Sequence, residues 1–369
     1  MTLPPGLLEK IVERACQIQR IAAPTFHEAD RAKYVFHAFE SEKLDAVYQD
    51  DAGNVIARIA GSGNARPLIV SAHLDTVFPL GTDLTLTRSS NTLAGPGIGD
   101  NSLGVAALFG LLWILRAEHH IPAGDIYLVA NVCEEGLGNL HGMTSVVNHF
   151  RGDPAAYIIL EGMGLGVIFH RALGVQRYKI QIHTRGGHSW ADYGKPSAVH
   201  EIGKLITRLT ALPIPSKPRT TLNVGVVHGG TTINSLAADA SLELDLRSEG
   251  QLNLQFLCQQ VEEIVRNINQ DGIACTSEII GKRPSGEISA QHPLVKQAVQ
   301  ALQAEGLHTQ TSIGSTDANI PLSLGYPAIC LGITTGKGSH TLAESLEIAP
   351  IEKGMSAMYR LIIGCESLI

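Results

Sequence analysis

The sequence predicts an α/β fold with a mostly parallel sheet, interrupted by a second, α+β unit. From residue 54 to residue 160, short apolar runs bounded by turn residues alternate with helical segments, as in covered parallel sheets. After residue 174, apolar and polar residues alternate instead, which is typical of an antiparallel sheet with one solvent-exposed face. After Pro293, a helix and an apolar run restore the first pattern. The second unit is therefore predicted to be an insertion into the first.

The composition is that of an ordinary globular protein with two domains. The chain has 369 residues, whereas single cores stop growing at roughly 250 to 300 residues. Hydrophobic residues make up 44 % of the chain, and the formal net charge is only −7. These values and the lack of a basic stripe argue against a disordered chain or a nucleic-acid-binding protein.

The cysteines and the apolar runs indicate a reducing compartment. The six cysteines are scattered and include no Cys-x-x-Cys pair, so they are interpreted as buried thiols. Residues 1–15 carry acidic residues where a signal peptide needs a basic start. The most apolar run, Leu103 to Leu115, is shorter than the roughly 20 residues of a membrane span. We expect a cytoplasmic protein without nucleic-acid or membrane partners.

The elements of the first unit follow from hydrophobic periodicity, and this unit is expected to comprise residues 1–173 and 286–369. Helices are predicted over 7–20, 27–43 and 102–119, with another after Pro293. Strands are predicted at the apolar runs 54–59, 68–72, 126–132, 157–160 and 327–333.

The inserted unit is expected to span residues 174–285. Its segments VQRYKIQIHT, TTLNVGVVH and SLELDLRS alternate apolar and polar residues, and helical segments lie near 197–211 and 251–270. We therefore expect two βαβ-like halves that form a four-stranded antiparallel sheet with two helices.

The stretch LIVSAHLDTVFP, residues 68 to 79, is the first sign of a functional site. His73 and Asp75 lie on the same face of an extended segment, because side chains alternate along a strand. They stand at the end of the strand, where open α/β folds carry their chemistry. For this pair alone, a structural histidine beside a solvated aspartate is an equally good interpretation.

Further acidic and imidazole side chains fall at the ends of the other strands of the first unit. They are Asp100 in GPGIGDNS, Glu134 and Glu135 in VCEEGLG, Glu161 in YIILEGMG, and His340 in GKGSHT. Each has a structural alternative: Asp100 could cap the following helix, and the paired glutamates could form a solvated turn. Several such coincidences at successive strand ends favour a functional site.

The set fits two divalent metal ions that share one carboxylate. We assign one ion to His73, Asp100 and Glu161, and the other to Asp100, Glu135 and His340. Three carboxylates and one hydroxide balance the four charges of two zinc ions, so such a cluster can be buried. Zinc suits mixed imidazole and carboxylate ligands, and cobalt or manganese would also fit. Two ions about 3.5 to 4 Å apart can activate water and polarise a carbonyl.

Two acidic side chains remain outside this ligand set. Asp75 could accept the second ring proton of His73 and so fix its tautomer. Glu134 adjoins a ligand and could act as general base on a metal-bridging water, then protonate the leaving amine. The alternative for Glu134, a solvated side chain, is less favoured.

Eight segments extend this pattern over nearly the whole chain. In order they are SAHLDTV, GPGIGDNSLGVAAL, CEEGLG, LEGMGLG, TRGGHS, INSLAADASLELDLR, GSTDAN and GSHT. Together they resemble the co-catalytic zinc exopeptidase family, which includes aminoacylase, acetylornithine deacetylase, succinyl-diaminopimelate desuccinylase, glutamate carboxypeptidase and bacterial tripeptidase. The resemblance implies the roles given above, a lid and dimerisation domain over 174–285, and a cis peptide between Asp100 and Asn101.

The resemblance adds three residues in the inserted unit. His188 in GGHSW matches a lid histidine that family dimers lend to the partner's active site, where it stabilises the oxyanion. Asn234 and Arg247 match a pair that grips a substrate carboxylate. From the residues alone, a loop histidine, a turn asparagine and a surface arginine would be preferred.

The sequence therefore predicts a homodimeric, dinuclear metal-dependent hydrolase of amide bonds in small peptides, as in a carboxypeptidase or a di- or tripeptidase. The alternative within the same class is an N-acyl amino acid deacylase, because both substrates present a carboxylate. A rival of another class is a binding or scaffold protein that has lost catalysis. The presence of Glu134 argues against it, because a structural metal site does not need a base.

Overall fold

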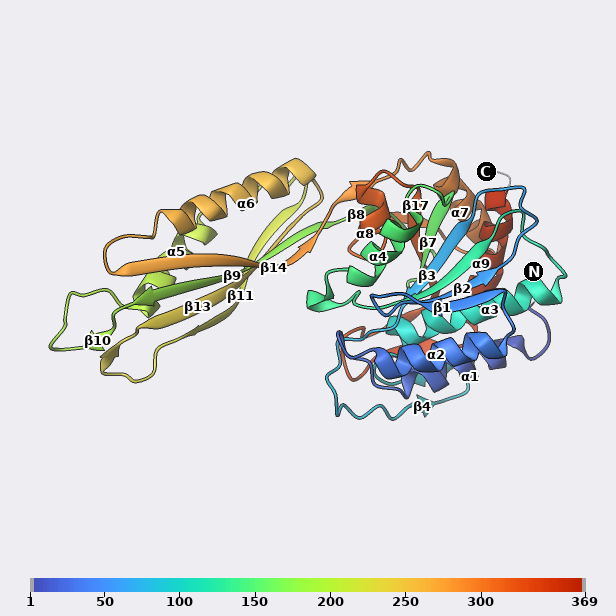
Figure 1. Cartoon of the computed structure of the whole chain (residues 1–369), viewed down its shortest axis with the longest axis horizontal. Coiled ribbons are helices and arrows are strands. Elements are labelled where there is room, and N and C mark those ends of the chain that lie inside the picture. The colour runs from blue at the N-terminus through green and yellow to red at the C-terminus, as the bar shows by residue number, and fades with distance from the viewer. Residues whose placement is uncertain (1–2, 367–369) are drawn as a thin grey trace. The chain divides into compact units, whose positions relative to one another are not determined.

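The computed structural model describes residues 3–366 and divides into two compact units (Figure 1). One unit is Leu173–Ser285, and the other holds the described residues before and after it. The inserted unit therefore begins and ends at neighbouring strands of the first unit, β8 (Val167–Ala172) and β15 (Gly286–Glu287), which pair antiparallel.

The first unit is built on a sheet that has nine strands within residues 3–366. Its order is β1-β2-β6-β3-β7-β17-β8-β15, and β16 also pairs with β8. The central strands β6, β3, β7 and β17 are parallel, whereas the pairs β1/β2, β2/β6 and β17/β8 are antiparallel. The prediction of a mostly parallel sheet is thus confirmed; the antiparallel pairs lie toward the edges, where β16 nevertheless pairs parallel with β8. The bounds are β1 Ala46–Gln49, β2 Val55–Ile59, β3 Leu68–His73, β6 Ile126–Asn131, β7 Ala156–Met163, β16 Gln310–Gly314 and β17 Ala328–Thr334.

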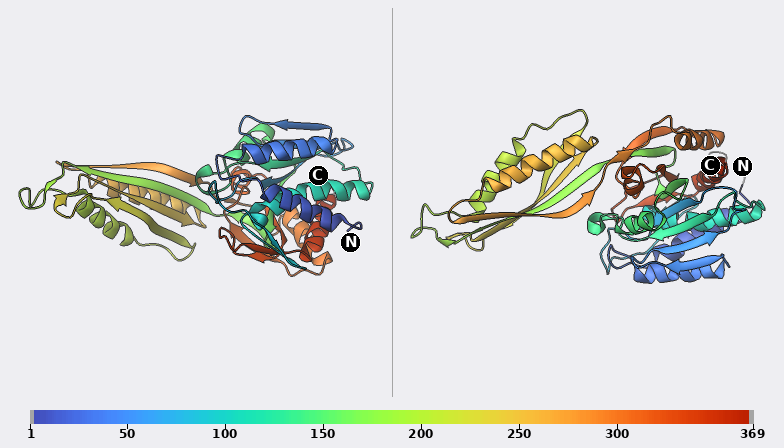
Figure 2. Two further views of the ribbon diagram at one scale, coloured as in Figure 1. Left: turned by 90° about the horizontal axis from the view of Figure 1, so that it is seen from below. Right: turned by 45° about the horizontal axis from the view of Figure 1, so that its top comes forward.

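Helices cover both faces of this sheet (Figure 2). Side chains of β3 alternate between two hydrophobic cores: Leu68 and Val70 face one, and Ile69 faces the other. Because both faces are buried, the strand reads as a continuous apolar run. The first core is closed by α1 Leu7–Gln19, α2 Ala29–Ser41, α3 Leu103–Ala117, α7 Pro293–Ala304 and α9 Pro350–Glu366, and the second by α4 His141–Phe150 and α8 Asn319–Ser323.

Helix α3 is the central core helix. With the turn η1 (Ile98–Ser102) it forms a 20-residue segment, Ile98–Ala117, which alone among the described residues has the length and apolar composition of a membrane span. The segment is longer than the run Leu103 to Leu115 on which the sequence prediction rested. Its most apolar window is 94 % buried within the protein, which is the position of a core helix.

A small sheet lies beside this turn. Its order within the described residues is β18-β19-β5-β4, with bounds β4 Thr87–Arg88, β5 Thr92–Ala94, β18 Gly336–Lys337 and β19 Ser345–Glu347. The pairing of β19 with β5 brings the chain around residue 344 next to residues 95–100.

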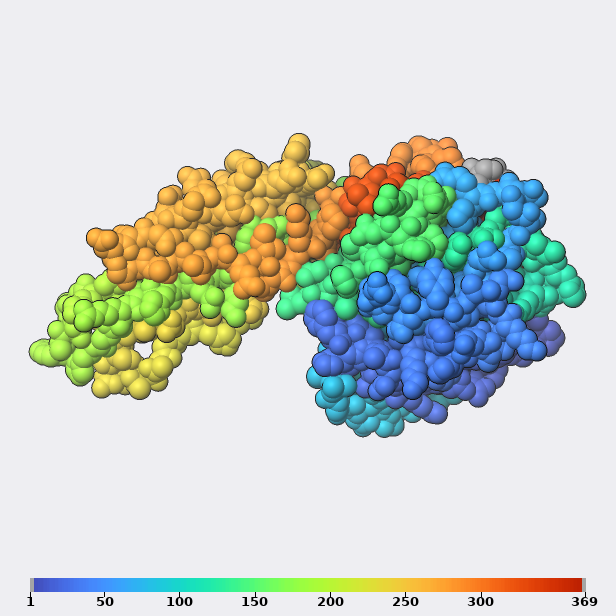
Figure 3. Space-filling model, in the orientation of Figure 1, coloured from blue at the N-terminus to red at the C-terminus, as the bar shows by residue number. Residues whose placement is uncertain are grey.

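The inserted unit contains an antiparallel sheet of four strands in the described chain, ordered β11-β13-β9-β14. Its two longer helices pack against the sheet and form a separate hydrophobic core; Figure 3 shows α6 (gold) at the surface of the unit. This confirms the predicted sheet and helices. The bounds are β9 Gly174–Thr184, β11 Thr220–Gly229, β13 Asp239–Ser248, β14 Ile273–Arg283, α5 Ala198–Thr210 and α6 Gln251–Arg266, with the short pair β10 Gly187–His188 and β12 Ser235–Leu236.

Candidate metal centre

The five predicted ligands converge at the carboxyl ends of the central parallel strands. His73 is the last residue of β3, Glu161 lies in β7, and Glu135 follows the end of β6. Because β6, β3 and β7 are neighbours, their carboxyl ends meet at one edge of the sheet. Asp100, in the turn before α3, and His340, after β18, complete the cluster.

The two oxygens of Asp100 face one imidazole each. Nε2 of His73 lies 3.2 Å from Oδ1 of Asp100 and 3.6 Å from Oε2 of Glu161. Nε2 of His340 lies 3.1 Å from Oδ2 of Asp100 and 2.9 Å from Oε1 of Glu135. The cluster thus consists of two trios that share Asp100, and within each trio one ligand atom per residue lies within 4.8 Å of the others.

This donor set fits two divalent cations. Each trio offers one imidazole nitrogen and two carboxylates, which suits zinc and related ions. His340 is about half exposed, with 53 % of its side-chain surface accessible, so the centre has an open side. A further group of potential ligands, His73, Glu134 and Glu135, satisfies the same distance criterion. Glu134 therefore lies at the centre and does not extend into solvent.

Asp75 organises the turn that carries the paired glutamates. Its Oδ1 accepts the backbone N–H of Glu134 at 2.9 Å, and its Oδ2 accepts that of Glu135 at 2.8 Å. The hydroxyl of Thr25 donates to Oδ2 at 2.9 Å. Nδ1 of His73 is 3.5 Å from the Asp75 carboxylate but 3.0 Å from the Asp75 backbone carbonyl. Nδ1 of His73, predicted to bond the Asp75 carboxylate, is therefore closer to the backbone carbonyl of Asp75. With either acceptor on Nδ1, Nε2 is free to bind a metal.

The carboxylates favour protonated imidazoles at this centre. Burial disfavours a charged His73, but Glu161 and Asp100 raise the pKa of its imidazole well above the usual range. Hydrogen bonds to Asp100 and Glu135 raise the pKa of His340 to about 10. Burial raises the pKa of the Glu161 carboxyl, and the neighbouring Asp100 and Glu135 raise it further. Metal ions would replace these protons as the balancing positive charge.

Glu344, which the sequence analysis did not single out, holds the turn that carries Asp100. It is fully buried, and its carboxylate accepts the backbone N–H groups of Gly97 at 3.1 Å, Gly99 at 2.6 Å and Asp100 at 2.9 Å. Burial raises the pKa of this carboxyl to about 7. A glutamate four residues after His340, in GSHTLAE, was the available signal in the sequence.

The peptide bond between Asp100 and Asn101 is cis, as the resemblance implied. The Asn101 side chain is buried and donates to the Leu160 carbonyl at 2.8 Å. Its Oδ1 accepts the backbone N–H of Gly162 at 2.8 Å and of Gly104 at 3.1 Å. Asn101 therefore ties the turn with Asp100 to the strand that carries Glu161.

His188 and Asn234 are neighbours in the inserted unit. His188 pairs with Ser235 in the short β10/β12 ladder, and the Asn234 carbonyl accepts the N–H of Ser189 at 3.0 Å. Nδ1 of His188 faces the backbone N–H groups of Trp190 at 3.2 Å and Ala191 at 3.3 Å. Because Nδ1 is an acceptor, the neutral ring carries its proton on Nε2, which is exposed and able to donate.

Arg247 is not part of this group within one inserted unit. It stands eight residues after Asp239 in β13, about 27 Å along the strand at roughly 3.4 Å per residue, whereas Asn234 precedes β12 at the other end. Nε of Arg247 donates to Asp245 at 2.7 Å. Asn234 and Arg247, predicted as a pair, are thus separated within the unit.

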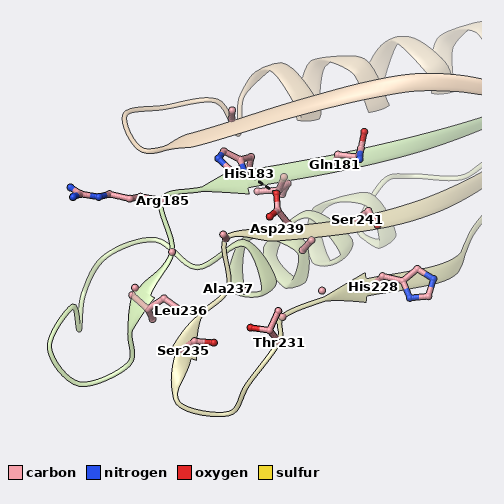
Figure 4. Close-up of a pocket in the computed structure, with 18 of the residues that line it drawn as sticks. Gln181, His183, Arg185, His228, Thr231, Ser235, Leu236, Ala237, Asp239 and Ser241 are labelled. Carbon is pink, nitrogen blue, oxygen red and sulfur yellow. Dashed lines mark hydrogen bonds and ion pairs between the residues drawn. The ribbon is translucent and has the colours of Figure 1, made fainter.

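A hollow of about 640 Å³ lies beside the loop that carries His188 (Figure 4). Its lining includes Gln181, His228 and Ser241, and His183 bonds Asp239 at 2.8 Å. Arg185 points away from the other labelled side chains (Figure 4). No residue of the predicted site lines this hollow, so the cluster in the first unit is the candidate centre.

A mostly parallel sheet with a cluster of carboxylates and imidazoles at its strand ends, together with an inserted α+β unit, is the arrangement predicted above for a metal-dependent hydrolase. Residues 69–364 match the model of peptidase family M20/M25/M40. The chain belongs to this family and is a metallopeptidase.

Two proteins of similar sequence and one solved structure illustrate the similarity. An uncharacterised protein of Bacillus subtilis, YqjE, is 23 % identical over 96 % of this chain and 98 % of its own. A probable carboxypeptidase of Aspergillus clavatus is 30 % identical over 60 % of this chain and 54 % of its own. The solved structure of a tripeptidase from Staphylococcus aureus superposes with a TM-score of 0.81 at 21 % identity, over 98 % of this chain and 99 % of that one. This structural likeness confirms the fold.

Proposed function

We propose that this protein is a dinuclear exopeptidase that hydrolyses small peptides, with Glu134 as general base. One observation carries the proposal: two trios of ligand-type side chains share Asp100, and the carboxyl of Glu134 lies beside them. Glu134 is 5 % exposed, and Asp75 fixes its backbone N–H. A buried carboxylate beside this cluster of ligand-type side chains is placed to exchange a proton with an attacking water.

The chain's own side chains divide the remaining work. When bound, two zinc ions would polarise the scissile carbonyl and make a water molecule more acidic. Glu134 accepts the proton of the attacking water and passes it to the leaving amine. The Nε2–H of His188 donates a hydrogen bond to the oxyanion. Exposure on the His340 side gives a peptide access to the cluster.

We propose small peptides with a free carboxylate as substrates. The names of two relatives, a tripeptidase and a probable carboxypeptidase, support this class. Asp245 holds Nε of Arg247 and thereby orients its guanidinium, which is suited to gripping a carboxylate. Since Asn234 and Arg247 are distant within one unit, the proposed grip joins Arg247 of one subunit and Asn234 of the other.

A homodimer through the inserted unit is part of the proposal. Strand β11 is an edge of its sheet, and Val226 and Val227 on it are exposed. An open edge with apolar side chains is suited to pairing with a second copy. Trp190 and Tyr193, which follow His188, are 86 % and 89 % exposed, which supports a contact of this loop with the partner.

Hydrolysis measured across dipeptides, tripeptides and N-acetyl amino acids tests the proposed function. The chelated protein would be assayed after addition of zinc, cobalt or manganese. We expect turnover of peptides, with one of these metals required. Turnover of N-acetyl amino acids alone would identify a deacylase instead, and no turnover with any metal would favour a binding protein.

A further inference from the structure

Asp317, in the GSTDAN segment, is a buried acid that the proposed reaction does not use. It stands in the turn before α8 and is fully buried, as is Asn131 at the end of β6. Nδ2 of Asn131 donates to Oδ2 of Asp317 at 2.7 Å. This contact joins a turn near the carboxyl end of the chain to the strand that precedes Glu134.

The pair contains two oxygens without a partner. Among residues 3–366, Oδ1 of Asp317 and Oδ1 of Asn131 are both buried and accept no hydrogen bond. Unpaired acceptors in the interior are costly. A single proton on Oδ1 of Asp317 would supply the missing donor for Asn131. Acid and amide would then form a ring with two hydrogen bonds, one donated by each partner.

The surroundings favour that proton. The charged or titratable groups that interact electrostatically with Asp317 are His73 from β3, Asp75 after it, Glu161 from β7 and Cys330 from β17. Burial raises the pKa of the Asp317 carboxyl to about 7, with His73 and the Asn131 hydrogen bond opposing the shift, and Asp75 and Glu161 adding to it.

We propose that Asp317 is a neutral carboxylic acid that pairs with Asn131 through two hydrogen bonds and so positions the strand ends beneath the metal centre. Asn131 pairs with His73 in the sheet register, and its carbonyl accepts the N–H of Leu74 at 2.7 Å. Glu134 follows three residues later. Asp317 is therefore a positioning residue that acts through Asn131 and does not touch the substrate.

The variant Asp317→Asn tests the proton directly, because an amide reproduces both hydrogen bonds of a neutral acid. Infrared difference spectra of the metal-loaded proteins at about pH 6 would compare wild type with this variant, in which the Asp317 carboxyl is absent. We expect wild type to show an additional protonated-carboxyl band that shifts in D₂O. Glu344 is present in both proteins and cancels. Absence of the band would mean an ionised Asp317, with a water molecule bridging the pair, and would overturn the proposal.

Metal content and kinetics give the second readout, with Asp317→Leu as the matched apolar variant. We expect Asp317→Asn to retain two ions per chain and a kcat within about threefold of wild type. Asp317→Leu should lower kcat by ~10- to 100-fold with little change in KM, as loss of a supporting contact at a metal site does. If Asp317→Asn loses bound metal, or has its kcat lowered, as severely as Asp317→Leu, then the site requires the negative charge of an ionised Asp317 and the proposal fails. The kinetic comparison and the metal content rest on the proposed function and its two ions, whereas the infrared band does not.

Discussion

At the scale of single residues, Glu134 separates catalysis from metal binding. Glu134→Gln keeps the size of the side chain but cannot accept the proton of the attacking water. We expect kcat to fall by at least ~10²- to 10⁴-fold, the usual contribution of a general base, with both ions retained. Metal analysis of the same preparation is the control. Loss of an ion would place Glu134 among the ligands, in the group with His73 and Glu135.

The raised pKa values of the two imidazoles predict that metal binding releases protons. Carboxylate neighbours raise the pKa of His340 to about 10 and that of His73 well above the usual range, so each ion displaces protons at neutral pH. Affinity should therefore rise with pH. Calorimetric titrations in two buffers of different ionisation enthalpy should give different heats. Equal heats would show that the imidazoles are already neutral.

The raised pKa of His340 also determines how the stability of the metal-free protein depends on pH. A folded-state pKa above the unfolded value of about 6.5 for histidine means that the charged form is stabilised by folding. This contribution of His340 is fully present below about pH 6.5 and is lost as pH rises through about 10. Removing the metal should thus lower stability more at alkaline than at mildly acidic pH.

At the scale of elements, the turn before α3 depends on Glu344. Glu344→Ala leaves the N–H groups of Gly97, Gly99 and Asp100 without their acceptor, and a buried unpaired group costs about 1 to 3 kcal/mol. We expect a lower unfolding temperature and weaker binding of both ions, since both trios contain Asp100. Glu347→Ala, three residues on and exposed, is the control. Unchanged metal affinity in Glu344→Ala would show that the turn holds Asp100 without this carboxylate.

Hydrophobic periodicity predicted those elements whose burial follows a regular pattern along the chain. Strand β3 is buried on both faces and read as an apolar run, and β9 and β13 alternate because one face of their sheet is covered. The separate strand β14 was not individually predicted, since its middle residues are exposed and a bulge interrupts its register. Residues at strand ends indicated the cluster. The hydrogen bonds of Glu344 and Asp317 could not be predicted, because they depend on contacts between segments far apart in sequence.

At the scale of the whole molecule, the proposed dimer makes His188 a residue of the partner's site. The variants His188→Ala and Glu134→Gln should each be inactive, yet regain activity when mixed and allowed to exchange subunits. One site of each mixed dimer then combines an intact Glu134 with an intact His188, whereas the other has neither. Recovery should approach one working site per mixed dimer. If verified mixed dimers stay inactive, or an isolated monomer works at full rate, His188 does not act across the interface.

The most direct test of the account is a zinc titration of the chelated protein, with bound zinc and hydrolysis of the best peptide followed in the same samples. The two trios that share Asp100 predict that two ions bind per chain and that peptide hydrolysis reaches its maximum at two equivalents. Full activity with one ion per chain, or two bound ions without hydrolysis of any peptide, would contradict it.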